Sequence, residues 1–160
     1  MTLVRGFLVV TVLVLPLGAW AQSKWIWGKD ARQPEASIEF SQSFELSGHA
    51  VSARLQAVAD FSSLDVRING KSVGQAPAHG PLLSLEVAGH LLKGKNLVSI
   101  TARSTGEAPA VALRLDWTDA KGGRGAVFSN EKWKSGKGTI ESFGSLSVES
   151  WWNLPPLSVD

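Results

Sequence analysis

Residues 86–100 read EVAGHLLKGKNLVSI, a short polar segment between two runs in which apolar and polar side chains alternate. Residues 88–92 predict a single helical turn, and its two leucines are expected to pack into the core. Gly94 stands where a left-handed residue ends such a turn. The side chain of Asn96 can then bond to nearby backbone before the next strand begins. The segment therefore predicts strand, turn and strand.

Alternation with period two recurs on both sides of this segment, and it is the main signal for secondary structure. Its apolar members on one parity are Ile38, Phe40, Phe44 and Leu46; Ala53, Leu55, Ala57 and Ala59; Leu64, Val66 and Ile68; Leu83, Leu85 and Val87; Val98, Ile100 and Ala102; and Val111, Leu113, Leu115 and Trp117. One apolar and one polar face per strand is typical of antiparallel sheets. Asn69-Gly70 predicts a type I′ hairpin turn. The pattern predicts an all-β fold, an antiparallel β-sandwich.

The first residues have the order of a secretory signal. Arg5 precedes an apolar run over residues 7–17, and small residues at Ala19 and Ala21 form an A-x-A cleavage site. The run has about eleven residues, against the roughly 20 that a membrane anchor needs. We therefore expect a leader over residues 1–21, a mature chain that starts at Gln22, and a secreted or periplasmic protein that is not embedded in a membrane.

The remaining residues suit one domain with one core. We expect the sandwich to occupy residues 22–144. Residues 145–160 are expected to form an edge strand and a linker, because Trp151-Trp152 precedes Pro155-Pro156 and a proline pair cannot continue a sheet interior. This end is expected to lead to a further domain.

Composition excludes several classes of function. The chain has no cysteine, which excludes disulfides, zinc ribbons, iron–sulfur sites and thiol catalysis. The formal net charge is +2, without the basic run of a nucleic-acid-binding protein. The composition is unusual in having seven tryptophans and no tyrosine. Nucleic acid is therefore not expected as a partner.

Motifs of catalysis are not present in the sequence. The histidines are scattered without an HExxH pair, and neither a G-x-S-x-G elbow nor a P-loop occurs. The aspartates that remain as candidates for a glycosidase-type pair are Asp60, Asp65, Asp116 and Asp119. Asp65 and Asp116 alternate with core residues and are interpreted as solvent-facing strand charges. We predict no enzymatic activity, no catalytic site and no metal site.

Five segments in order carry a family resemblance. They are Trp25-Ile26-Trp27, the strand with Phe40 and Phe44, LQAVAD at residues 55–60, VRINGKSVG at residues 66–74, and the segment at residues 86–100. Together they resemble galactose-binding-like jelly rolls, the accessory domains of glycoside hydrolases such as α-L-rhamnosidases and family-two β-galactosidases. The lack of tyrosine is a departure, and the residues after Gly136 have no clear match.

The resemblance implies an exported, non-catalytic carbohydrate-binding or accessory module. Two alternatives stay open: a structural or protein-interaction domain of a larger secreted protein, and the N-terminal fragment of a glycoside hydrolase. The resemblance implies no cofactor, although such domains can hold a structural calcium through loop carboxylates and carbonyls. No loop in this chain has a ligand spacing that singles out a calcium site.

Trp133 is the candidate sugar-binding aromatic. It lies in the polar run FSNEKWK at residues 128–134, where Asn130 can bond hydroxyls while the ring stacks on a pyranose. His79 joins the same rim if the two loops meet at one end of the sandwich. The alternative is that Trp133 covers an open end of the sandwich. Trp25, Trp27 and Trp117 are expected in the core, and any glycan affinity is expected to be weak, nearer about 1 mM than 1 nM.

Overall fold

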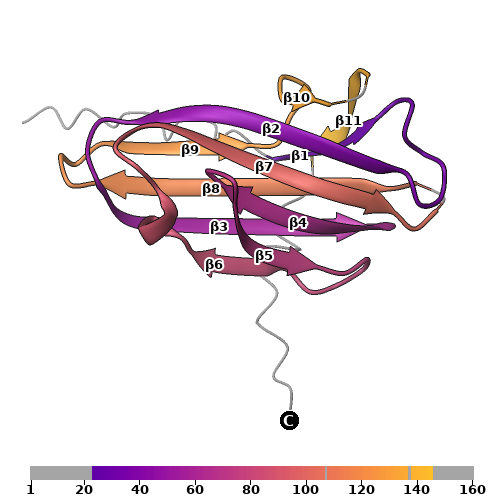
Figure 1. Ribbon diagram of the computed structural model, residues 1–160, viewed down its shortest axis with the longest axis horizontal. Helices are drawn as coiled ribbons and strands as arrows, with labels where there is room; N and C mark the ends of the chain where they lie inside the picture. Colours follow the sequence, from indigo (N-terminus) through magenta and orange to yellow (C-terminus); the bar gives the residue numbers. More distant parts are fainter. Residues whose placement is uncertain (1–22, 107, 137, 146–160) are drawn as a thin grey trace, which may run out of the picture.

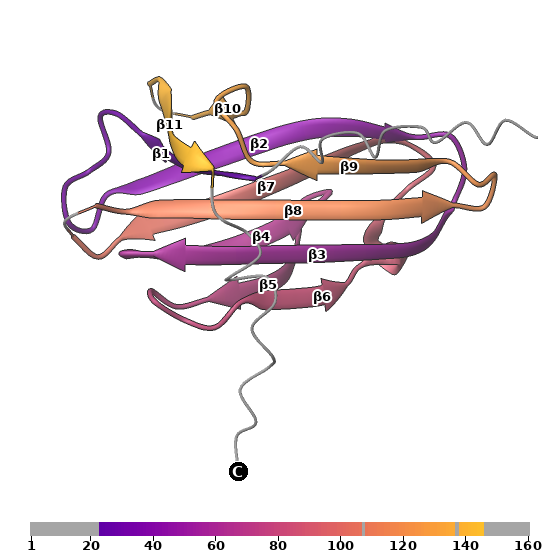
Figure 2. The same ribbon diagram turned by 180° about the vertical axis from the view of Figure 1, so that it is seen from behind.

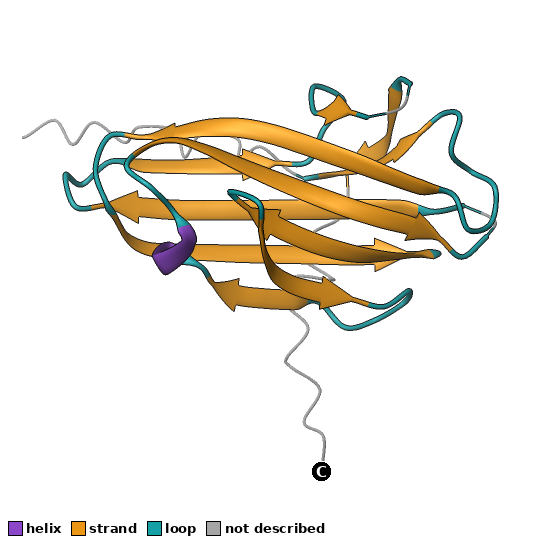
Figure 3. Ribbon diagram, in the orientation of Figure 1, coloured by secondary structure: helices purple, strands orange, loops and turns teal. Residues whose placement is uncertain are grey.

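The chain folds into two antiparallel β-sheets that face each other (Figures 1 and 3). The structure is a computed structural model that describes residues 23–106, 108–136 and 138–145. The expected leader at residues 1–21 and the Trp151-Trp152 pair lie outside the described residues. The all-β sandwich predicted from alternation is confirmed.

The first sheet, called here the β8 sheet, has the strand order β11-β1-β8-β3-β6, with β9 also paired to β8 (Figure 2). Its strands are β1 (Lys24–Gly28), β3 (Ala50–Asp60), β6 (Leu83–Glu86), β8 (Ala110–Asp119), β9 (Arg124–Phe128) and β11 (Ile140–Ser145). The second, the β7 sheet, has the order β10-β2-β7-β4-β5. Its strands are β2 (Ser37–Leu46), β4 (Ser62–Ile68), β5 (Lys71–Ala76), β7 (Gly94–Ser104) and β10 (Lys134–Ser135). Within the described ranges, no helix is long and apolar enough to cross a membrane.

The core lies between the sheets and is made by the apolar parity of each strand. Leu55, Val66 and Ile100 are fully buried there. Trp27 is fully buried as expected, and its ring meets Phe40 edge to face at a centroid distance of 5.9 Å. Burial of large apolar side chains from both layers is the main stabilising contribution in such a fold.

The two turns expected from local chemistry are confirmed. Asn69 and Gly70 have φ values of 51° and 81°, as a type I′ turn requires. The expected helical turn is the 3₁₀ turn η1 (Ala88–His90), and Gly94 has φ 86°. Asn96 is buried, and its amide donates to the carbonyl oxygens of Leu92 and Gly94 at 2.7 and 3.0 Å.

One leucine of that turn, and not both, packs into the core. Leu91 is 7% exposed, whereas Leu92 is 58% exposed. The 3₁₀ turn ends at His90, and the chain extends at Leu91, so that consecutive residues point to opposite sides. The expectation that both leucines are buried is therefore wrong for Leu92.

The last described strand begins earlier than residue 145. It is β11 at Ile140–Ser145, an edge strand that pairs with β1 through Trp27 opposite Glu141. The edge strand expected within residues 145–160 stays a prediction, because Ser145 alone of that range is described. β11 itself was not predicted as a separate strand, since its alternation is weak and its partner lies more than a hundred residues away in the sequence. Residues 146–160 lie outside the described part.

Candidate functional site

The outer face of the β8 sheet carries a hollow of about 290 Å³ at the end where β3 finishes and β8 begins. Its lining residues are Trp25 from β1, Arg32 from the β1–β2 loop, Asp60 from the end of β3, and Ala108, Pro109 and Ala110 from the start of β8 and the loop before it. Asp60 pairs with Ala110 across the strands, on the parity that faces away from the core. The hollow is therefore open to solvent and not enclosed between the sheets.

Trp25 lies on this outer face. Ile26 and Trp27 of β1 are fully buried, but the ring of Trp25 packs against Val58 and Ala112 in a separate cluster. Those two residues are on the outward parity and yet are 1% and 0% exposed. The expectation that Trp25 belongs to the core between the sheets is wrong, because β1 carries its ring to the opposite face. The half-buried ring supplies an apolar wall to the hollow.

Charged groups stand beside this wall. Nδ1 of His79 lies 2.8 Å from Oδ1 of Asp60, and the two side chains are 53% and 42% exposed. The guanidinium of Arg32 forms an ion pair with Glu141, which also lies 3.6 Å from the ammonium of Lys29. A carboxylate acceptor and a guanidinium donor, each held by a protein partner, therefore flank an aromatic surface. This arrangement can bond the hydroxyls of a ligand that stacks on the ring.

Trp133 does not present its ring to solvent. It is 4% exposed, belongs to the core cluster, and donates from Nε1 to the carbonyl oxygen of Phe128 at 2.8 Å. The turn before it is closed by Asn130, whose amide donates to the same carbonyl and accepts from the backbone N–H of Lys132. The expected exposed stacking ring is therefore wrong, and the burial fits the alternative in which Trp133 covers the core.

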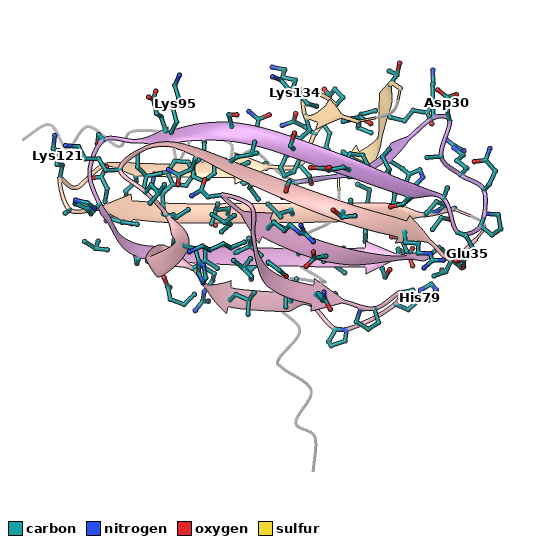
Figure 4. All side chains as sticks on the ribbon, in the orientation of Figure 1. Asp30, Glu35, His79, Lys95, Lys121 and Lys134 are labelled. Carbon is teal, nitrogen blue, oxygen red and sulfur yellow. The ribbon has the colours of Figure 1, made fainter. Side chains whose placement is uncertain are left out.

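His79 and Trp133 do not meet at one rim. His79 lies at the lower edge in Figure 4, whereas Lys134, the residue after Trp133, lies at the upper edge. The side chain of Asn130 forms hydrogen bonds within its own turn, as described above. A ligand-binding role for Asn130 and Trp133 stays a prediction, and the buried ring of Trp133 does not support it. His79 instead contacts Asp60 and the ring of Phe61.

No described group of three or more histidine or carboxylate side chains is placed to hold a metal ion. The Asp119 carboxylate accepts from the Ser47 hydroxyl at 2.6 Å and from backbone N–H groups of the neighbouring turns. The Asp65 carboxylate accepts from Ser72 and Arg67 at 2.5 and 2.8 Å. Protein donors thus satisfy these two carboxylates, and neither is arranged as a ligand for the structural calcium that such domains can hold.

A second, wider hollow of about 500 Å³ lies on the outer face of the β7 sheet. Its polar lining includes Ser63, Asp65, Gln75, Thr101 and Arg103. None of its lining residues is aromatic, so it has no ring for a sugar to stack on. The Trp25 hollow is therefore the stronger candidate for a sugar site.

Sequence reasoning missed Trp25, Arg32 and Asp60 as a group. Asp60 was considered only as half of a catalytic pair, and Arg32 was not singled out. Strand parity gave no signal for Trp25, because Trp27 has the same parity and yet lies with Ile26 in the core cluster. No sequence spacing predicts that Arg32 and Asp60 join it.

No family model and no curated protein matches this chain. Solved structures do match. An α-L-rhamnosidase from Streptomyces avermitilis, complexed with L-rhamnose, is 25% identical over 71% of this chain and 12% of its own, with a TM-score of 0.62. The apo lectin of Pleurotus ostreatus is 21% identical over 81% of this chain and 43% of its own, with a TM-score of 0.65. The same lectin in complex with GalNAc is 18% identical, with a TM-score of 0.56, over 81% of this chain and 44% of its own.

This chain spans less than half the length of each of these proteins. The likeness to the enzyme thus concerns a small part of it, and the likeness to the lectin concerns the fold. Together with the two antiparallel sheets, these matches show the galactose-binding-like β-sandwich that the sequence motifs predicted.

Proposed function

We propose that this chain is a non-catalytic carbohydrate-binding module of a larger protein, and that its sugar site is the hollow lined by Trp25, Arg32 and Asp60. The observation that carries the proposal is the half-buried indole beside a carboxylate and a guanidinium in one hollow. Sugar rings have an apolar C–H face and a rim of hydroxyls, so they need a flat ring together with a few placed polar groups.

The ligand we propose is a single uncharged pyranose. A hollow of about 290 Å³ lies at the lower limit of the roughly 300–1,000 Å³ typical of drug-sized ligands, which favours one ring over a chain. The two charges at its wall are matched by partners, Arg32 by Glu141 and Asp60 by His79. The wall therefore offers no excess positive charge for an acidic sugar.

Export and a position within a larger protein belong to the same proposal. The leader over residues 1–21 lies outside the described residues, and secretion or transfer to the periplasm stays a prediction from the sequence. The likeness to part of an α-L-rhamnosidase supports an accessory position beside another domain.

The test is a titration with methyl glycosides of L-rhamnose, D-galactose, N-acetylgalactosamine and D-glucuronic acid, followed by the indole N–H resonances in NMR spectra. We expect saturable shifts with a dissociation constant of about 1 mM for at least one neutral sugar, since one stacking ring and a few water-competed hydrogen bonds contribute little each. Glucuronide is expected to bind more weakly than the neutral sugars.

Three variants locate the site. Trp25→Ala is expected to abolish binding, with near-ultraviolet circular dichroism as the folding control, because the ring also covers Val58 and Ala112. Asp60→Asn removes a charge and no packing, and is expected to weaken binding. Glu39→Gln is the matched control, since Glu39 is an exposed carboxylate on the β7 sheet.

Two results would overturn the proposal. If folded Trp25→Ala and Asp60→Asn bind as the wild type does, the sugar site is elsewhere. If the wild-type chain binds none of the sugars, the interaction-domain alternative replaces the carbohydrate-binding one.

A further inference from the structure

Two residues outside the lining of the hollow, Phe61 and His79, lie next to its carboxylate, Asp60. We propose that His79 and Phe61 form a clamp that sets the direction of the Asp60 carboxylate toward the sugar. The inference rests on the proposed function and adds to it a positioning role for His79, which does not itself need to touch the ligand.

The first observation is the contact between the imidazole and the carboxylate. Nδ1 of His79 lies 2.8 Å from Oδ1 of Asp60, which is an ion pair when the ring is protonated and a hydrogen bond when the neutral ring carries its proton on Nδ1. This contact engages Oδ1 and favours one orientation of the carboxylate. Oδ2 is left to accept a bond from a ligand hydroxyl.

The second observation is the backbone at Phe61. This residue alone joins β3 of the β8 sheet to β4 of the β7 sheet, since β3 ends at Asp60 and β4 begins at Ser62. The corner requires φ 45°, a left-handed conformation that glycine or asparagine adopts more easily than phenylalanine. A bulky ring at such a corner indicates a gain that offsets the strain.

The backbone at His79 has the same property. The N–H of Gly80 donates to the carbonyl oxygen of Pro77 at 3.1 Å, which closes a turn with His79 at its third position. The φ of His79 is 55°, and this position of a turn with positive φ usually holds glycine or asparagine. The turn is what carries the imidazole to Asp60.

The two strained residues contact each other. The rings of Phe61 and His79 meet edge to face, with centroids 4.5 Å apart and an interplanar angle of 86°. Phe61 is also the chain neighbour of Asp60, so the clamp holds the carboxylate from the backbone on one side and from the imidazole on the other. Functional sites are where such local strain is commonly retained.

Two substitutions at His79 both suit the backbone of the turn, but only one of them keeps a hydrogen-bond donor. Asn tolerates positive φ, and its Nδ2 is bonded to Cγ as Nδ1 is in histidine, so His79→Asn keeps a donor near Asp60. His79→Gly relieves the backbone strain and removes the donor. Because both substitutions suit the turn, both proteins are expected to fold, which thermal unfolding checks.

The experiment is the sugar titration described above, carried out on wild type, His79→Asn and His79→Gly. We expect His79→Gly to bind about tenfold more weakly and His79→Asn to stay within about threefold of wild type, since one charge-assisted hydrogen bond sets the difference. His49→Asn is the matched control, because His49 is exposed at the opposite end of β3 and is expected to change nothing.

Imidazole ¹⁵N shifts supply a readout that needs no sugar. In wild type, the Nδ1 resonance of His79 is expected to show a hydrogen-bonded N–H that is lost in Asp60→Ala. The clamp would be overturned if the His79 Nδ1 resonance were the same in wild type and Asp60→Ala. It would also be overturned if His79→Asn and His79→Gly lost the same amount of sugar affinity. A wild type that binds no sugar but keeps the Nδ1 signal would overturn the proposed function, and with it the role of the clamp in binding.

Discussion

Asp119 is the buried carboxylate that holds the β2–β3 corner to the turn between β8 and β9. It accepts from the hydroxyl of Ser47 and from the backbone N–H groups of Gly48, Lys121 and Gly123. The Ser47 hydrogen bond is the main cause that lowers the pKa of Asp119 below its usual value, with the backbone donors adding to it against the opposing effect of burial. The ionised form is therefore the one that the fold stabilises.

A lowered pKa in the folded state predicts acid sensitivity. The stabilisation is fully present above the unfolded pKa of about 3.9 and is lost as the pH falls through the lower, folded value. We expect Asp119→Asn to be less stable at pH 7 and to lose less stability than wild type on going from about pH 5 to about pH 2. Urea unfolding across that range measures both, with Glu39→Gln as the control. An unchanged acid slope in Asp119→Asn would contradict the prediction.

At the scale of the residue, the sequence predicted those backbone conformations that depend only on a residue and its neighbours in the chain. Asn69-Gly70 and Gly94 were predicted from their own conformational preferences, and both have the expected positive φ. The exposure of Trp133 could not be predicted in this way. Whether its ring points out or in depends on how the turn at Asn130 closes and on the core that lies beneath it.

At the scale of the element, strand parity predicted the buried faces well. The apolar members of β3, β4 and β7 that alternation selected are all buried between the sheets. The pairing of strands was harder to predict from sequence, since β11 pairs with β1 and these strands lie at the two ends of the described chain. A weakly alternating edge strand has no local signal that fixes its start or its partner.

The corner from η1 to β7 allows a test of a single backbone angle. Gly94 has φ 86°, and nothing lies within 4 Å of the position that its Cβ would occupy. A side chain there meets no steric obstacle, so the cost of Gly94→Val is conformational, and we expect a loss of about 2 kcal/mol in the free energy of unfolding. Gly94→Asn is expected to cost less because asparagine tolerates this region.

Gly89 is the matched control for that prediction. It also has open space where a Cβ would stand, but its φ is not positive. Gly89→Val is therefore expected to cost clearly less than Gly94→Val in parallel urea unfolding. Equal losses at the two positions would show that the left-handed backbone at Gly94 is not the cause.

At the scale of the whole molecule, the candidate site depends on the order of the strands in the β8 sheet. Its members come from β1, the β1–β2 loop, the end of β3 and the start of β8, and the order of these strands in the sheet brings them together. Sequence predicted the sandwich and the likeness to accessory domains. It could not predict the site, because that depends on which loops share one end of the sheet.

The last prediction is that the chain does not hydrolyse glycosides. Glycosidases need two carboxyl groups roughly 5–9.5 Å apart across the bound sugar, one of which can act as an acid. Near the hollow, Asp60 is held by the imidazole of His79, and Glu141 is held by the cations of Arg32 and Lys29, so both carboxylates already have protein partners. We expect no release of nitrophenol from aryl α-L-rhamnosides or β-D-galactosides above the buffer blank. Turnover that Asp60→Asn or Glu141→Gln abolishes, in protein that stays folded, would make the hollow an active site and the chain an enzyme.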